Sequence, residues 1–268
     1  MRRLWALVAM TGLLAACATD ATQDPSVAAA TGSGPERAER LTVEVLATYP
    51  HDRTAFTQGL ELHDGLLYEG TGLEGRSELR TVRYETGEVT ARVALPDDVF
   101  GEGITIVGGH IWQLTWQDGV AFHRDLASLD ELRRVSYDGE GWGICYDGTR
   151  LVMSDGSAAL TFRDPQTFDA TGSVTVTLDG EPLTMLNELE CVAGRVWANV
   201  WQTDQIVRID PATGVVEAVV DASGLLSDEE RVGADVLNGI AAIDSGDTFL
   251  ITGKWWPTLF EVRFVPAE

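Results

Sequence analysis

The stretch EGITIVGGHIWQLTW, residues 102–116, contains two runs of alternating apolar and polar residues separated by Gly108 and Gly109. This pattern predicts a β-hairpin, because alternation with a period of two places one face of each strand in a core. Four other stretches match its pattern, the last of them two residues longer: QGLELHDGLLYEGTG (58–72), WGICYDGTRLVMSDG (142–156), NELECVAGRVWANVW (187–201) and NGIAAIDSGDTFLITGK (238–254). The chain therefore contains five copies of one hairpin.

The copies recur every 40 to 51 residues, measured between their aligned apolar positions Leu60, Ile104, Ile144, Leu189 and Ile240. Such a period, with several strands per unit, is typical of a β-propeller. Runs such as ELRTVRYE (78–85) and EVTARVAL (88–95) suit a third and a fourth strand. The last repeat lacks a fourth strand, which LTVEVLATYP (41–50) would supply, closing the ring and removing an open edge. We predict an all-β fold: one five-bladed β-propeller over residues 41–268, whose N-terminal strand closes the last blade. The longer segment 221–237 is expected to lie over one face and to carry a helical turn.

The N-terminus, MRRLWALVAMTGLLAAC, has two arginines followed by an apolar stretch that is too short to span a bilayer but has the form of a signal peptide. Its end, Leu14 to Cys17, resembles a bacterial lipobox, so residues 1–17 are interpreted as a lipoprotein signal with Cys17 as the lipidation site. The alternative is an ordinary signal peptide with a chance cysteine. Residues 18–40 read as a flexible tether. We expect export to the cell envelope, facing the periplasm, with membrane attachment only through the lipid on Cys17.

The net charge of −23, from 42 acidic and 19 basic residues, argues against binding to nucleic acid. The four histidines show no ligand spacing, and there is no His-Glu-x-x-His or Cys-x-x-Cys motif, so we predict no metal ion and no cofactor. Cys145 and Cys191 stand at equivalent positions of neighbouring repeats, where either a disulfide or two buried free thiols would fit. A closed ring needs no partner, which makes a monomer the expectation.

The repeat register also indicates a site. Two residues before each aligned apolar position stand residues that would surround the propeller axis at one height: Gln58, Glu102, Trp142, Asn187 and Asn238. Trp116, Trp201 and Lys254 end their hairpins beside them. A concave aromatic pocket with few polar groups is the usual form of a small-ligand site.

Plainer interpretations of these residues exist. The tryptophans could be core residues, Lys254 could cap a strand, and Glu102 between Gly101 and Gly103 could be a solvated turn. The register favours Glu102 pointing to the axis, with the two glycines as clearance for a substrate terminus.

Several stretches in order, among them AFTQGLELHDGLLYEGTGLEGRSELR, FGEGIT, GWGICYDG, NELECVAGRVWANVWQTD and TGKWWPTLFEV, resemble the plant and bacterial glutaminyl-peptide cyclotransferases from about residue 43 to 265. The resemblance implies a five-bladed propeller enzyme that converts N-terminal glutamine of peptides or proteins into pyroglutamate and ammonia without a metal. The family's active-site positions fall on Phe56, Gln58, Glu102, Trp116, Trp142, Asn187, Trp201 and Lys254.

Our mechanistic hypothesis makes Glu102 the proton shuttle, with Lys254, Gln58 and Asn187 as candidate stabilisers of the oxyanion. Phe56, the three tryptophans and Asn238 would bind the substrate. Two rival functions remain at this point. One is a non-catalytic lipid-anchored propeller that binds a peptide or a sugar at the tryptophan-lined mouth. The other is a lactonase-type enzyme, which would need a central metal with several acidic ligands.

Overall fold

The computed structural model describes residues 37–244 and 246–267, which lie within one compact unit, Pro35–Glu268. The predicted signal peptide, Cys17 and most of the predicted tether lie outside the described residues. The described residues form strands joined by turns, and among them there is no helix long and apolar enough to cross a membrane.

The described strands form three four-stranded antiparallel sheets, one eight-stranded sheet and a small two-stranded one. The first sheet contains β2 (Thr57–His63), β3 (Leu66–Thr71), β4 (Glu78–Arg83) and β5 (Glu88–Ala94). The second contains β6 (Gly101–Val107), β7 (His110–Thr115), β8 (Val120–Asp125) and β9 (Glu131–Ser136). The third contains β10 (Ile144–Tyr146), β11 (Leu151–Met153), β12 (Ala159–Arg163) and β13 (Ala170–Thr175), and the small sheet is β14 (Thr177–Leu178) with β15 (Glu181–Pro182).

The eight-stranded sheet has the order β16 (Leu186–Val192), β17 (Arg195–Val200), β18 (Gln205–Ile209), β19 (Val216–Asp221), β1 (Glu39–Pro50), β22 (Thr258–Pro266), β21 (Thr248–Gly253) and β20 (Leu237–Ile243). Its middle strand β1 pairs antiparallel with β22 over nearly its whole length, as the run 41–50 was expected to do. β1 also pairs in parallel with β19 over residues 39–42, which was not expected. This second pairing joins two hairpin repeats into one continuous sheet.

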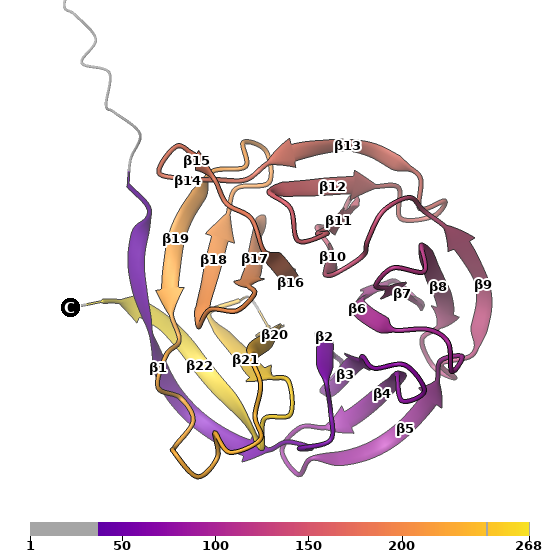
Figure 1. Ribbon diagram of the computed structural model, residues 1–268, viewed down its shortest axis with the longest axis horizontal. Helices are drawn as coiled ribbons and strands as arrows, with labels where there is room; N and C mark the ends of the chain where they lie inside the picture. The colour runs from indigo at the N-terminus through magenta and orange to yellow at the C-terminus, as the bar shows by residue number, and fades with distance from the viewer. Residues whose placement is uncertain (1–36, 245, 268) are drawn as a thin grey trace, which may run out of the picture. The chain divides into compact units, whose positions relative to one another are not determined.

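The sheets lie side by side around a common centre, and the first strand of each hairpin repeat lies innermost (Figure 1). These inner strands contact one another in a cycle, β2 with β6, β6 with β10, β10 with β16, β16 with β20, and β20 with β2. The prediction of an all-β, propeller-like fold is confirmed.

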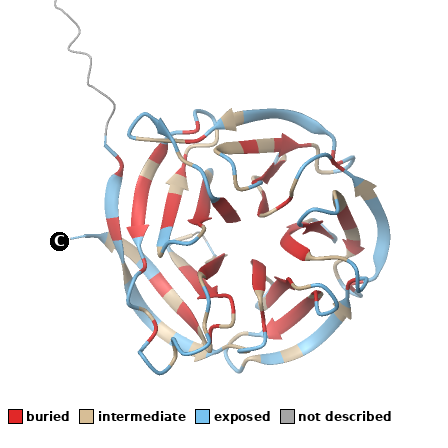
Figure 2. Cartoon of the chain, in the orientation of Figure 1, coloured by how far each residue is buried: buried red, intermediate tan, exposed pale blue. Residues whose placement is uncertain are grey.

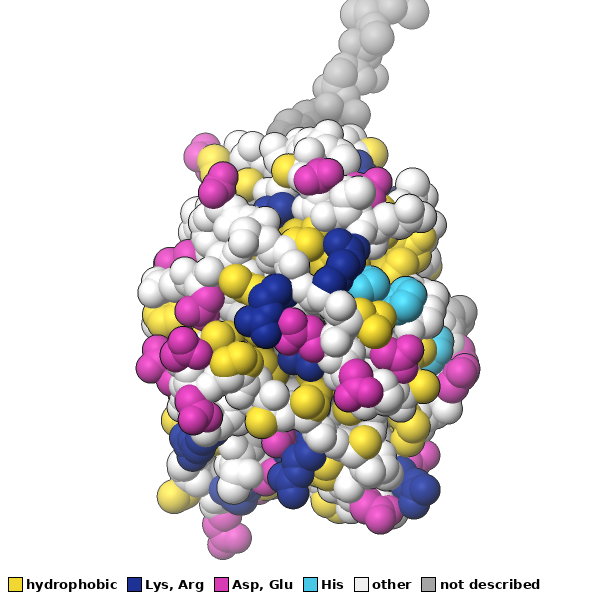
Figure 3. Space-filling model, turned by 90° about the vertical axis from the view of Figure 1, so that its right-hand side faces the viewer, with side chains coloured by type: hydrophobic (Ala, Val, Ile, Leu, Met, Phe, Trp, Pro, Cys, Tyr) yellow, Lys and Arg dark blue, Asp and Glu magenta, His cyan; other side chains and the backbone are white. Residues whose placement is uncertain are grey.

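The core is divided into clusters of buried apolar side chains, each lying between two neighbouring groups of strands. Inner strands are buried almost throughout, whereas outer strands such as β5, β9 and β13 are largely exposed (Figure 2). On the outer face shown in Figure 3, basic and acidic side chains are interspersed with small apolar patches. On this face the charged side chains are thus exposed, and the apolar side chains that form the core lie between the sheets.

Two local expectations can be compared with the structure. The segment 221–237 has one helical turn, in which the Arg231 N–H donates to the Ser227 carbonyl at 3.0 Å, but no helix. Cys145 of β10 and Cys191 of β16 form a disulfide with their Cα atoms 5.4 Å apart. Of the two alternatives for these cysteines, the structure contains the bridge, and it joins neighbouring inner strands.

Candidate active site

The polar residues that the repeat register places at the axis lie where the inner strands lose their regular pairing. The ladder is interrupted between Thr57 and Gly59, between Gly101 and Ile104, between Leu186 and Leu189, and between Leu237 and Ile240. Gln58, Glu102, Asn187 and Asn238 are the residues inside these irregularities. A β-bulge of this kind bends the strand and redirects a side chain, which explains how polar groups leave the sheet and meet near the axis.

Glu102 is 4% exposed, and its carboxylate is joined to the neighbouring repeats through side-chain amides. Gln58 donates from Nε2 to Glu102 Oε1 at 2.9 Å. Asn238 donates in turn to Gln58 Oε1 at 3.3 Å and to the Thr57 carbonyl at 3.0 Å. One carboxylate oxygen is therefore held in place, and the other, Oε2, has no hydrogen-bond partner among the described residues.

A cavity of about 400 Å³ opens above these groups. It is lined by the sequence-predicted residues Phe56, Gln58, Glu102, Trp116, Trp142, Asn187, Trp201 and Lys254, together with Phe100, Gln202, Asp235 and Val236. Asn238 is fully buried and does not line this cavity. We therefore correct its predicted role as a substrate-binding residue: its amide lies behind Gln58 and holds that side chain in place.

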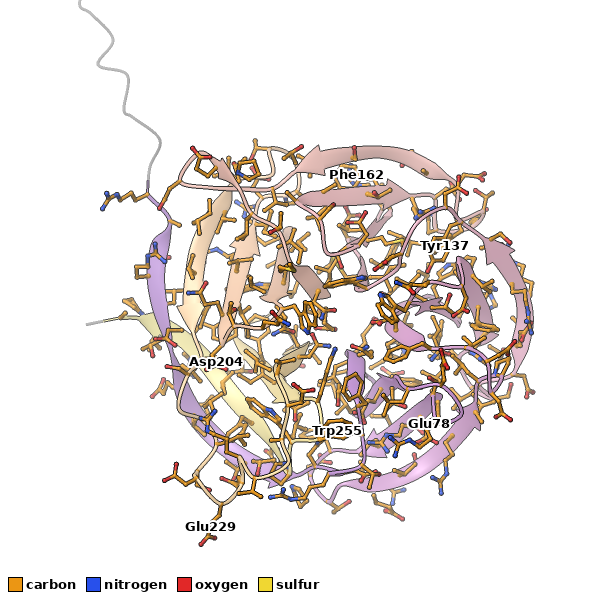
Figure 4. The ribbon with its side chains drawn as sticks, in the orientation of Figure 1. Glu78, Tyr137, Phe162, Asp204, Glu229 and Trp255 are labelled. Atoms are coloured by element: carbon orange, nitrogen blue, oxygen red, sulfur yellow. A yellow bond between two sulfur atoms is a disulfide. The ribbon has the colours of Figure 1, made fainter. Side chains whose placement is uncertain are left out.

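Aromatic rings form the walls of the cavity. Trp142 and Trp201 meet edge to face with ring centroids 5.3 Å apart. Trp255, labelled in Figure 4, packs against Phe56 at 4.9 Å, and Phe100 lies between Phe56 and Trp116. Such walls exclude water and leave the few polar groups to orient a ligand.

Lys254 follows β21 and is held by its backbone. Its N–H donates to the Val236 carbonyl at 2.9 Å, and its carbonyl accepts from the Asp235 N–H at 2.8 Å. The ammonium lies 4.7 Å from the centre of the Phe56 ring, within the range of a cation–π contact. The lysine is buried, and its ammonium is near enough to Glu102 for each charge to shift the pKa of the other.

Burial shifts the pKa values of Glu102 and Lys254 in the directions that favour their neutral forms. It raises the pKa of Glu102 well above its usual range, although the Lys254 ammonium acts in the opposite direction. Burial likewise lowers the pKa of Lys254, against the effect of Glu102. A carboxyl group whose pKa is raised toward neutrality can both accept and return a proton near neutral pH.

The expectation that Gly101 and Gly103 give clearance to a substrate is wrong. A Cβ atom on Gly103 would lie 2.8 Å from the Trp142 carbonyl oxygen, and one on Gly101 would lie 2.7 Å from that of Thr71. The Gly103 N–H donates to this same Trp142 carbonyl at 2.9 Å. The glycines are needed because neighbouring backbones approach closely, not because a ligand enters there.

Sequence reasoning missed Phe100 and Val236 on the cavity wall. Both stand two residues before an axial residue, as Phe56 does. The repeat alignment that located Glu102 therefore also marks a second set of cavity residues, two positions earlier in each repeat and closer to the mouth. Asp235, Gln202 and Trp255 lie in connecting loops, where the repeats are too different in length to align.

The site thus combines a buried carboxylate with one free oxygen, a buried ammonium and carboxamide groups at a small aromatic cavity. Among the described residues, no group of three or more His, Cys, Asp or Glu side chains is arranged to hold a metal ion. The arrangement is suited to moving a proton within a desolvated small ligand while donors stabilise negative charge on an oxygen.

Comparison with known proteins places this chain among close relatives. The Glutamine cyclotransferase family model matches residues 11–264. The glutaminyl-peptide cyclotransferase of Arabidopsis thaliana is 39% identical over 245 residues, which cover 88% of this chain and 76% of that protein. The solved structure of the glutaminyl cyclase of Myxococcus xanthus superimposes with a TM-score of 0.79 at 38% identity, covering 87% of this chain and all of that one.

Proposed function

The chain belongs to the glutamine cyclotransferase family, and we propose that it carries out the family's reaction in the cavity around Glu102. As a glutaminyl-peptide cyclotransferase it acts on peptides or proteins with N-terminal glutamine, closing that residue to pyroglutamate with release of ammonia. We place the reaction in this cavity because of the buried carboxylate of Glu102. One of its oxygens is held by Gln58, and the other is unpartnered among the described residues.

In the proposed mechanism the α-amine of the substrate attacks the Cδ carbon of its own side-chain carboxamide. A C–N bond forms, the carbonyl oxygen becomes an oxyanion, and the Glu102 carboxylate takes a proton from the attacking nitrogen. Protonated Glu102 then gives this proton to the amide nitrogen, the oxyanion re-forms the carbonyl as the C–N bond to that nitrogen breaks, and ammonia departs. Because the pKa of Glu102 is raised by burial, it lies closer to the pKa of an α-amine, which favours proton transfer.

The cavity contributes by holding the two reacting groups together. Positioning an amine next to the carbon it attacks is worth several kcal/mol, on the order of 7 or more in favourable cases. Lys254, Gln58 and Asn187 supply donors on the cavity wall for the developing oxyanion. The tryptophan walls keep water from the carbonyl carbon, which favours closure of the ring over hydrolysis.

The experiment is to incubate the protein with a short peptide that begins with glutamine and to measure ammonia and the loss of one ammonia mass. The matched control is the same peptide with an acetylated N-terminus, which removes the nucleophilic amine. Release from the free peptide well above the spontaneous rate, and none from the acetylated one, is the expected result. A rate equal to the spontaneous one would contradict the proposal and favour a binding module.

For the fold, we propose that the eight-stranded sheet consists of two blades, β16–β19 and β20–β22 with β1, so that the propeller has five. This count is supported by the five hairpin repeats and by the cycle of inner-strand contacts. The short parallel pairing of β1 with β19 would then be a hydrogen-bonded contact between two neighbouring blades.

For location, we propose that residues 1–17 direct export and that a lipid on Cys17 holds a monomeric enzyme at the cell envelope, facing the periplasm. The composition of the N-terminal stretch supports this. Metabolic labelling with a fatty acid, lost in a Cys17→Ser variant, is the expected result. Equal labelling of both proteins would contradict the anchor.

A further inference from the structure

One repeat departs from the others at the rim of the cavity. The position two residues before each axial residue is apolar in four repeats and acidic in the third, as the series Phe56, Phe100, Glu140, Met185 and Val236 shows. Three of the four apolar members line the cavity directly. Glu140 does not line it, and a carboxylate at a position that is apolar in the other four repeats calls for another explanation.

The Glu140 carboxylate binds two walls of the cavity at once. Its Oε2 accepts from the indole N–H of Trp116 at 2.8 Å and from that of Trp142 at 2.9 Å. Its Oε1 accepts from Gln117 Nε2 at 2.8 Å. Trp116 ends the hairpin of the second sheet and Trp142 precedes the first strand of the third, so this one side chain ties neighbouring sheets together at the mouth.

Each indole packs against another aromatic ring of the cavity, Trp116 against Phe100 and Trp142 against Trp201, but both remain partly exposed, Trp116 by 37%. An indole N–H is a donor only, so each ring needs an acceptor to settle its orientation. A single oxygen that accepts from both sets the angle between the two rings and thereby the width of the cavity beneath them.

The charge of Glu140 also acts on the central carboxylate. The hydrogen bonds from Trp142, Gln117 and Trp116 lower the pKa of Glu140, so it remains ionised at neutral pH. Its negative charge raises the pKa of Glu102, in the direction opposite to the effect of Lys254. The pKa of the nearby Tyr137 hydroxyl is raised chiefly by burial, and the charge of Glu102 acts in the same direction.

We propose that Glu140 is a positioning residue of the reaction: it fixes the indoles of Trp116 and Trp142 and supplies the negative charge that balances Lys254 at Glu102. The inference rests on the proposed function. It predicts two separable effects, one on substrate binding through the cavity shape and one on the pH dependence through the charge.

Two variants separate these effects. In Glu140→Gln, the new carbonyl oxygen can still accept from both indoles, and the new amide can donate to Gln117 if that side chain turns its own amide over. The charge alone is then lost. In Glu140→Ala, both the hydrogen bonds and the charge are lost. The control is Asp138→Asn, which removes one negative charge from an exposed residue of the same loop that does not contact the indoles.

The experiment measures kcat and KM for the glutamine peptide across pH, with the melting temperature of each variant as a check on folding. For Glu140→Ala we expect KM to rise about tenfold, because the indole N–H groups of Trp116 and Trp142, both on the cavity wall, lose their acceptor. For Glu140→Gln we expect KM within about threefold of the parent, as its three contacts are kept. In both Glu140 variants the acidic limb of the pH profile of kcat/KM should move to lower pH, because the charge that raises the pKa of Glu102 is gone. Asp138→Asn should leave KM and this limb unchanged.

Each outcome decides one point. An inactive parent protein would mean that the proposed function itself has failed. An active parent with unchanged KM in Glu140→Ala and an unmoved acidic limb in both variants would overturn the inference. If Glu140→Ala does not fold, the pH profile of kcat/KM of Glu140→Gln still tests the inference. A shift of its acidic limb to lower pH supports the inference, and no shift overturns it.

Discussion

At the scale of single residues, the proposed chemistry depends on two buried groups of opposite charge, Glu102 and Lys254, that act on each other electrostatically. Glu102 has its pKa raised by burial while the ammonium of Lys254 holds it down. Neither residue would behave in this way on the surface, where solvent screens the charges. The irregularities in the inner strands make the arrangement possible, because they release Gln58 and Glu102 from the alternating pattern of the sheet.

Replacing Lys254 by Met tests this pairing. The variant removes the charge that lowers the pKa of Glu102, so the acidic limb of kcat/KM should move to higher pH. The value of kcat should fall by about 10², as for loss of one oxyanion donor. An Arg76→Met variant, which removes one exposed positive charge, serves as the control. A limb that stays in place would show that Lys254 does not act on Glu102.

Much of the site was predictable residue by residue because the repeats provide an internal alignment. That register identified Gln58, Glu102 and Asn187, which all line the cavity. It gave the direction of each side chain but not its depth, so it could not show that Asn238 lies fully buried behind Gln58. Glu140 was missed because its role depends on two indole N–H groups, whose meeting point no spacing reveals.

At the scale of strands and hairpins, the inner elements were predictable and the outer ones less so. Inner hairpins share one length and one apolar pattern across the repeats, because their strands are buried against neighbouring sheets. β9 was missed, since it is the outermost strand of its sheet and is largely exposed, with only Leu132 and Val135 as apolar residues. The parallel pairing of β1 with β19 was also missed, because a four-residue contact leaves no pattern in the sequence.

The bridge between Cys145 and Cys191 belongs to this scale, since it joins β10 to β16 across 46 residues of chain. A crosslink that closes a loop of this length is typically worth about 2–4 kcal/mol. We expect a Cys145→Ser/Cys191→Ser double variant, or the parent in reductant, to melt several degrees lower. Activity at room temperature should be retained, because neither cysteine lines the cavity. An equal melting temperature with and without reductant would contradict a stabilising bridge.

At the scale of the whole molecule, the inner strands are joined by carboxylates as well as by backbone contacts. Glu188 accepts from the N–H groups of Leu60 and Ile240, on two other inner strands. Glu61 accepts from the Ile106 N–H at 2.7 Å. Burial raises the pKa of both, that of Glu61 to about 7. These acids carry protons in the folded state that the unfolded chain would have lost.

This arrangement makes stability depend on pH. Because the folded state holds more protons than the unfolded one between about pH 4.5 and 7 at Glu61, stability is lost as pH rises through that window. Glu61→Gln needs no proton and can keep the bond to Ile106. It should therefore stabilise the protein at pH 8 by roughly 1–3 kcal/mol and have little effect at pH 5. Urea unfolding at both pH values, with exposed Glu74→Gln as control, measures this; equal effects at both would contradict it.

In the proposed reaction, Glu102 moves the proton during cyclisation of N-terminal glutamine. The decisive measurement is ammonia release from a glutamine peptide, for the parent and for Glu102→Gln at matched folded concentration. We expect the variant to lose about 10²-fold or more of the rate while its melting temperature is maintained or raised, since a buried acid is replaced by an amide of the same shape. A folded Glu102→Gln variant with near-parental ammonia release would contradict it.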